Sequence, residues 1–267
     1  MSCRFLARFL HDALLGVTLS ATLAASASAT NLVLNGDFEN NGGVGQLANG
    51  ISFATNWSNG AAQGGGDGFG FVVDANADST GFPSVYSAGS GTNIFLWGPG
   101  YTPNPVSNGF TGSPNGGSFL GASGGFSAAP ISQTISGLTP GETYTLSFTW
   151  AASQFTDNVG ATSQYWDVSF GGTTVSTDTA SVASRGFVDW APYTHDFTAT
   201  SFTETLSFLA QGSPAGNSPF LLIDGISLSA AAAAVPEIDP ASAGSVMALM
   251  LGALGLLDSR ARRRQSV

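Results

Sequence analysis

The chain has 267 residues, 43% of them apolar, with a formal net charge of −10. Its 19 phenylalanines supply a core, which excludes a disordered chain, and its length suits one large domain between processed ends. There is no lysine, and Arg185 is the only basic residue between Asn31 and Ala234, against thirteen carboxylates. Such an interior cannot neutralise phosphates in number, which excludes nucleic acid as a partner.

The only cysteine, Cys3, precedes the apolar stretch of the N-terminal segment. A mature protein that lacks this segment has no thiol. Disulfides, a thiolate metal site and a cysteine nucleophile are therefore excluded.

The N-terminal segment has the order of a secretory signal. Arg4 and Arg8 come first, an apolar run follows over residues 13–25, and Ala27-Ser28-Ala29 ends it. This order predicts a helical signal peptide over residues 1–29 and a mature start near Thr30. The alternative is an uncleaved anchor, although the run is shorter than the roughly 20 apolar residues that span a bilayer.

The C-terminal segment combines a linker over residues 231–242 with a short hydrophobic helix and a basic end over residues 243–267. The linker contains Val235, Pro236 and Glu237, and the basic end contains Arg260, Arg262, Arg263 and Arg264. An apolar run followed by arginines stops in the inner membrane with its basic end in the cytoplasm. An ordinary single-span anchor is the alternative.

This tripartite tail resembles the PEP-CTERM sorting signal. The resemblance implies processing by an exosortase, a transient membrane anchor, and delivery to the bacterial cell surface or to extracellular polysaccharide. The sequence departs from the family pattern at Ile238-Asp239-Pro240, where a proline usually follows the glutamate directly. That departure leaves open which exosortase variant reads the tail.

The interior, residues 30–230, has the patterns of an all-β domain. Residues 143–150 alternate small polar with large apolar side chains, which places Tyr144, Leu146, Phe148 and Trp150 on one face of a strand. Further strands are predicted over residues 31–38, 51–57, 69–73, 93–97, 131–135, 165–170, 187–197, 203–209 and 221–228. Residues 98–117 are too rich in Gly, Pro and Asn for a strand and predict a surface loop. Many short strands separated by turns indicate a β-sandwich.

Several segments in order resemble the galactose-binding-like jelly roll of carbohydrate-binding modules. They are residues 31–39, Trp57, residues 131–144, Trp190 and residues 220–228. The resemblance implies a jelly roll whose first and last strands lie close together, and a structural Ca²⁺ held by Glu39, Asp224 and possibly Asp37. Two carboxylates distant in sequence suit the oxygen-rich coordination of Ca²⁺. The competing interpretation is that Asp37 and Asp224 form turn hydrogen bonds only.

Sugar recognition requires exposed aromatic faces with polar groups beside them. Four rings at predicted loop boundaries are the candidates: Trp97, Tyr101, Tyr165 and Trp166. Trp57, Trp150 and Trp190 match core positions of that family or an apolar strand face. The competing interpretation of the four candidates is that they belong to the core, as aromatic residues more often do.

The residues for catalysis are few. His195 is the only histidine outside the signal segment, which leaves no zinc site with several histidines. Residues 121–125 match a Gly-x-Ser-x-Gly pattern, but no predicted helix follows them as a nucleophile elbow requires. No enzymatic activity is predicted.

The sequence therefore favours an exported, non-catalytic protein of the cell surface or extracellular matrix that associates with glycan or exopolysaccharide. The alternative is a structural or adhesive surface protein without sugar recognition. A secreted glycoside hydrolase is the third hypothesis. Its two catalytic carboxylates are defined by their distance in space and not by their spacing in the sequence, so the sequence does not reveal such a pair.

Overall fold

The computed structural model describes residues 30–48, 51–62, 66–85, 93–215 and 219–231. The chain forms two compact units, residues 1–230 and 231–267. The predicted signal peptide lies outside the described residues, as do the predicted sorting residues Val235, Pro236, Glu237, Arg260, Arg262, Arg263 and Arg264. Over the described ranges, no helix is both long and apolar enough to cross a bilayer.

The described residues form twelve strands. They are β1 (Gly45–Gln46), β2 (Ser58–Asn59), β3 (Gly70–Asp74), β4 (Ser118–Ser123), β5 (Ile131–Ser136), β6 (Thr143–Gln154), β7 (Thr162–Phe170), β8 (Thr173–Ser176), β9 (Ala180–Val182), β10 (Val188–Thr198), β11 (Thr203–Ser213) and β12 (Pro219–Ala230). The all-β prediction is confirmed for this part of the chain.

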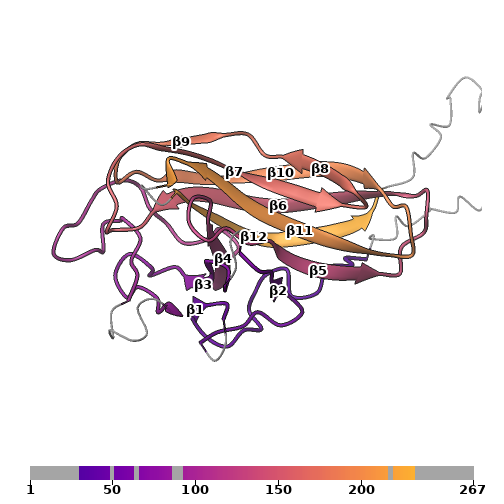
Figure 1. Cartoon of the computed structure of the whole chain (residues 1–267), viewed down its shortest axis with the longest axis horizontal. Coiled ribbons are helices and arrows are strands. Elements are labelled where there is room, and N and C mark those ends of the chain that lie inside the picture. The colour runs from indigo at the N-terminus through magenta and orange to yellow at the C-terminus, as the bar shows by residue number, and fades with distance from the viewer. Residues whose placement is uncertain (1–29, 49–50, 63–65, 86–92, 216–218, 232–267) are drawn as a thin grey trace, which may run out of the picture. The chain divides into compact units, whose positions relative to one another are not determined.

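The strands pair antiparallel in two sheets (Figure 1). The first sheet has the order β1-β3-β4-β12-β6-β10. The second has the order β2-β5-β11-β7-β8, with β9 also paired to β7. Side chains of both sheets share one hydrophobic core, including Leu146 and Leu221 of the first sheet and Trp166 and Phe208 of the second. The two sheets are therefore the layers of a sandwich.

Strand β6 shows why this sequence folds as it does. Its alternation places Tyr144, Leu146, Phe148 and Trp150 in the core between the sheets, each less than a tenth exposed, as predicted. Full burial of such a side chain contributes about 1.5–3 kcal/mol. The intervening threonines and serines face outward because successive side chains of a strand point to opposite faces.

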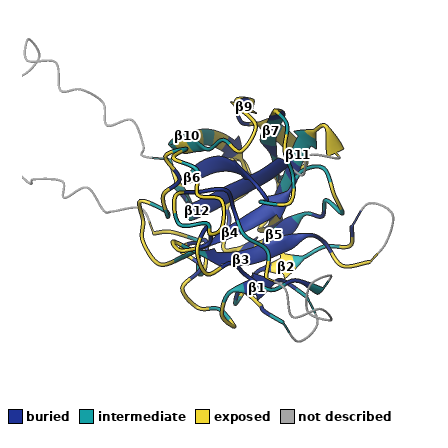
Figure 2. Cartoon of the chain, turned by 90° about the vertical axis from the view of Figure 1, so that its left-hand side faces the viewer, coloured by how far each residue is buried: buried dark blue, intermediate teal, exposed yellow. Residues whose placement is uncertain are grey.

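A second core lies on the other face of the first sheet. Alternate residues of β12 divide between the two cores: Leu221 lies between the sheets, whereas Phe220 and Leu222 contact the second cluster. Phe82, Leu96 and Phe110, from the long connection between β3 and β4, cover this face. Within that connection, residues 98–117 form no strand, as predicted, and Figure 2 shows the buried strands surrounded by exposed loops.

Three predicted strands are wrong. Residues 31–38 form none, because Asn35 and Phe38 adopt positive φ angles of 52° and 56°, which a ladder does not accommodate. Residues 51–57 and 93–97 form only isolated bridges. The first segment nevertheless lies beside the last strand, as predicted: the Leu32 amide donates to the Leu228 carbonyl oxygen at 2.8 Å.

Candidate functional site

The outer face of the second sheet carries Tyr165, one of the predicted sugar-binding residues. It lies on β7, where Gln164 and Trp166 point into the core and Ser163, Tyr165 and Asp167 point outward with partial exposure. Strand periodicity fixes this separation, because neighbouring residues cannot share a face. We call the outward residues of β7 and their neighbours in register the β7 row.

Register brings polar groups beside the ring. Gln211 of β11 lies directly opposite Tyr165, and Asp167 has Leu209 on one side and Ser176 of β8 on the other. The Ser176 hydroxyl donates to Asp167 Oδ1 at 2.6 Å, and Gln211 Nε2 donates to Asp167 Oδ2 at 3.0 Å. These two bonds hold the carboxylate and the amide in a defined geometry beside the phenol ring.

A hollow of about 580 Å³ begins one outward position before Tyr165. Ser163 lies in it, with Ser213 of β11 and Ser181 of β9 as its partners in register. The remaining lining residues are Ala161, Thr162, Val182, Ala183 and Pro214. The β7 row thus offers three serines, then an aromatic ring, an amide and a carboxylate, on β7 itself and on the strands paired with it. The hydroxyls of a sugar chain can form hydrogen bonds with these polar groups, and the apolar face of a pyranose can stack on the aromatic ring.

The other predicted aromatic residues are placed differently. Trp166 is fully buried and Trp97 is 3% exposed, so neither presents a free ring face. The guanidinium of Arg185 covers Trp97 at 4.7 Å, and the Trp97 indole N–H donates to the Asn158 carbonyl oxygen. Tyr101 contacts Trp97 edge to face and is partly exposed. Trp97 and Trp166 therefore belong to the packed interior, whereas sugar binding by Tyr101 and Tyr165 stays a prediction.

Two of the three predicted calcium ligands lie in one cluster. Asp224 of β12 is fully buried. It accepts hydrogen bonds from the Ser113 hydroxyl and the Gly225 amide, and the negative charge of Glu39 raises its pKa. Glu39 accepts from the Ser118 amide at 2.8 Å. Asp37 is exposed, and no hydrogen bond joins it to this cluster within the described part of the chain.

Burial controls the ionisation of this cluster. The pKa of Asp224 is raised to about 6, mainly because burial removes the hydration of its charged form. The charge of Glu39 adds to this rise, and hydrogen bonds from Ser113 and Gly225 oppose it. The cluster is tight, because a Cβ on Gly117 would lie 1.7 Å from a Glu39 carboxylate oxygen. A buried carboxylate beside a second one, with the Ser113 hydroxyl in contact, fits the hard oxygen ligands that Ca²⁺ prefers. Calcium binding stays a prediction.

Neither catalytic pattern gains support from the geometry. Residues 121–123 of the Gly-x-Ser-x-Gly pattern lie within β4, and Ser123 is fully buried there. His195 lies on β10 between Tyr193 and Phe197, whose rings it contacts. Among the described residues, no three His, Cys, Asp or Glu side chains gather as a metal centre would need.

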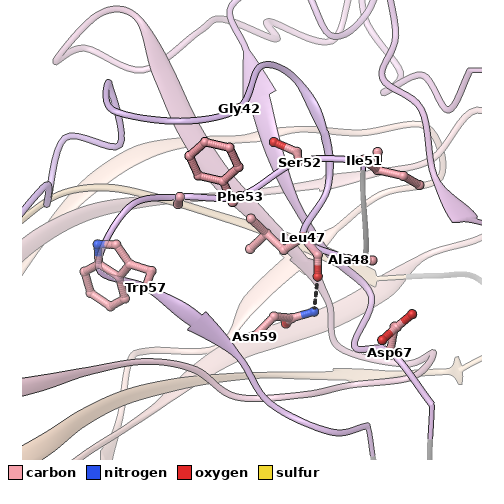
Figure 3. Close-up of a pocket in the computed structure, with 10 residues that line it drawn as sticks. Gly42, Leu47, Ala48, Ile51, Ser52, Phe53, Trp57, Asn59 and Asp67 are labelled. Atoms are coloured by element: carbon pink, nitrogen blue, oxygen red, sulfur yellow. Dashed lines mark hydrogen bonds between the residues drawn. The ribbon is translucent and has the colours of Figure 1, made fainter.

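Sequence reasoning missed a second hollow, of about 480 Å³, in the loops around β1 and β2 (Figure 3). Its lining consists of Gly42, Leu47, Ala48, Ile51, Ser52, Phe53, Ala54, Trp57, Asn59 and Asp67. Phe53 is 58% exposed, which is unusual for a phenylalanine. The alternating pattern of residues 51–57 had predicted a strand there, and no local signal distinguishes a strand residue from a ring on a loop.

No protein-family model matches the sequence, and no curated protein matches it. Solved structures with partial similarity include TmCBM61 in complex with β-1,4-galactotriose, which is 15% identical with a TM-score of 0.41 and covers 76% of this chain and 100% of its own. The CBM22-1 xylan-binding domain from Paenibacillus barcinonensis Xyn10C is 10% identical with a TM-score of 0.33, over 79% of this chain and 100% of its own. The enzymatically active domain of bacteriophage CBA120 tailspike protein 4 is 15% identical with a TM-score of 0.32, over 75% of this chain and 21% of its own. Similarity at this level carries no argument about function.

Proposed function

We propose that this chain is an exported, non-catalytic glycan-binding protein of the bacterial cell surface or extracellular matrix, with a jelly-roll domain that binds polysaccharide. The observation that carries the proposal is the β7 row. There a partly exposed ring, Tyr165, lies opposite the amide of Gln211 and next to the anchored carboxylate of Asp167. Ring, amide and carboxylate together match the apolar face and the hydroxyls of a pyranose.

The linear arrangement supports a polymer as the ligand rather than a single sugar. The hollow at Ser163 and the ring of Tyr165 follow one another on the same strand, and outward positions of a strand repeat every 6–7 Å or so. A glycan chain that lies along β7 contacts several of these positions at once. Phosphate-rich polymers are disfavoured, because Arg185 is the only cation of the domain.

Export and sorting complete the proposal. The signal-like segment over residues 1–29 and the exosortase-type tail over residues 231–267 support delivery through the inner membrane to the surface. Mass spectrometry of the protein from the cell-surface fraction is expected to find both segments removed. An intact end at Arg260–Arg264 on surface-located protein contradicts the sorting part of the proposal.

Affinity electrophoresis in gels that contain the polysaccharide of the native matrix tests the binding part. The protein is expected to migrate more slowly in the polysaccharide gel, and Tyr165→Ala is expected to lose most of that retardation. Phe202→Ala is the control, because Phe202 is 71% exposed and is not among the lining residues of the hollow beside Tyr165. Equal migration of all three proteins favours the alternative, a structural or adhesive protein.

A further inference from the structure

The hollow around Phe53 combines a fixed aromatic ring with the carboxylate of Asp67, which has no partner among the described residues. Its volume of about 480 Å³ lies within the range of small-molecule sites, roughly 300–1,000 Å³. Figure 3 shows Phe53 and Asp67 on different sides of the hollow, with Leu47 between them. The ring of Phe53 and the carboxylate of Asp67 can therefore contact a ligand from different sides.

The ring of Phe53 is held in place although it is mostly exposed. A Cβ on Gly42 would lie 2.7 Å from two carbons of the ring, so the ring rests directly on the backbone of Gly42. The Gly42 amide also donates to the Phe53 carbonyl oxygen at 2.9 Å. A ring fixed in this way loses little conformational entropy when a ligand stacks on it.

The walls below the ring are also fixed. Asn59 Nδ2 donates to the carbonyl oxygens of Leu47 and Gly68 at 2.9 and 3.0 Å and so joins two loops of the hollow. The indole N–H of Trp57 donates to the Asn35 carbonyl oxygen, which fixes the wall beside Phe53. The hollow is thus formed before any ligand arrives.

Asp67 is the only ionisable residue among the described residues that line the hollow. It is exposed, and no hydrogen bond or ion pair to its side chain exists within the described part of the chain. Between Asn31 and Ala234, the sequence contains thirteen carboxylates and a single arginine. The local and the overall charge therefore both favour a ligand with positive charge.

We propose that this hollow binds one residue of a glycan that carries free amino groups. The apolar face of the sugar ring stacks on Phe53, and its ammonium group donates a charge-assisted hydrogen bond to the carboxylate of Asp67. The inference rests on the proposed glycan-binding function and names its substrate class, a polymer of amino sugars that are not fully acetylated. It uses residues distinct from the β7 row, so substitutions at the two sites have separate effects.

Calorimetry with three tetrasaccharides tests the inference: β-1,4-linked glucosamine, its N-acetylated counterpart and β-1,4-linked glucose, at low salt and a pH at which the amines are protonated. The glucosamine tetramer is expected to bind about 2–5-fold more tightly than the other two, the range of one ion pair at an exposed site. Asp67→Asn is expected to remove this preference, and Phe53→Ala to weaken all binding at the hollow.

Asp157→Asn is the matched control, because Asp157 is exposed, does not line the hollow and carries the same charge. Retained preference in Asp157→Asn and lost preference in Asp67→Asn support the inference. Equal effects of the two substitutions, or equal affinity for the glucose tetramer, overturn it and leave the proposed function intact. If no glycan binds to the protein and Tyr165→Ala changes nothing, the proposed function itself fails.

Discussion

Residues 165 and 166 show how far sequence reasoning reaches at the scale of single side chains. Both rings were predicted to bind sugar, yet Tyr165 is partly exposed whereas Trp166 is fully buried. Strand periodicity allows only one of two neighbours on the outer face, so the sequence could predict that the two differ. It could not predict which one is buried, because that depends on which face packs against the other sheet.

The contrast predicts separate effects of two substitutions. Trp166→Ala is expected to lower the free energy of unfolding by about 3–5 kcal/mol, because it leaves a large cavity between the sheets. Tyr165→Ala is expected to change it by no more than about 0.5 kcal/mol, since the side chain lies on the surface. Urea denaturation measures both. A similar loss of stability in the two variants contradicts the assignment of faces.

The raised pKa of Asp224 leads to a second prediction at this scale, on the pH dependence of stability. Its pKa in the folded protein, about 6, lies above its usual value of 3.8, so the folded state binds the proton more tightly than the unfolded state. Protonated Asp224 therefore contributes its full stabilisation below about pH 4. As the pH rises through 6, this contribution to the free energy of unfolding is lost, about 3 kcal/mol in total. Glu39 is the charged group that faces it.

Asp224→Asn is expected to remove this component in metal-free protein. Unfolding free energies measured from pH 4 to pH 7 in chelator should fall more steeply for the wild type than for the variant. Parallel curves for the two proteins contradict a raised pKa at this position.

At the scale of elements, alternation predicted β6 correctly but failed for residues 51–57, which form only isolated bridges, and small residues concealed a strand. Strand β6 follows its polar and apolar alternation, but β4 contains Gly121, Ala122 and Ser123, which resemble a loop in sequence. At Gly121 a neighbour requires the small residue, because a Cβ there would lie 2.4 Å from the ring of Phe220. Long-range packing of this kind leaves no local pattern.

Gly121→Ala is accordingly expected to lower the free energy of unfolding by about 1–3 kcal/mol through overpacking. Thr134→Ala is the control, because Thr134 is exposed on β5 of the other sheet and is expected to have an effect within about 0.5 kcal/mol. Thermal and urea denaturation of both variants check the difference. A stable Gly121→Ala protein would show that Phe220 moves freely.

At the scale of the whole molecule, the cluster of Glu39 and Asp224 connects segments from both ends of the domain. Without disulfides, a cation bound there stabilises the folded state by mass action. Removal of Ca²⁺ with chelator is expected to lower the Tm by several degrees, and added Ca²⁺ to restore it. The resemblance to carbohydrate-binding modules implied this site from sequence. No motif identifies its contact with Ser113, in the connection between β3 and β4, or its contact with Ser118, the first residue of β4.

Two matched variants decide whether this cluster holds the ion. Glu39→Gln is expected to abolish the response to chelator. Asp37→Asn is expected to retain it, because Asp37 is exposed and forms no hydrogen bond with the cluster in the described part of the chain. An unchanged Tm of the wild type in chelator contradicts the calcium proposal. Glycan binding along β7 does not depend on that outcome.

The central claim is that glycan lies along the β7 row. Titration of the ¹⁵N-labelled protein with oligosaccharides of the native matrix, followed by backbone amide NMR shifts, tests it most directly. The account predicts that the largest shifts occur on Ser163, Tyr165, Asp167 and Gln211, which share the outer face of the second sheet. Shifts confined to other surfaces, or no shifts at saturating oligosaccharide, would contradict it.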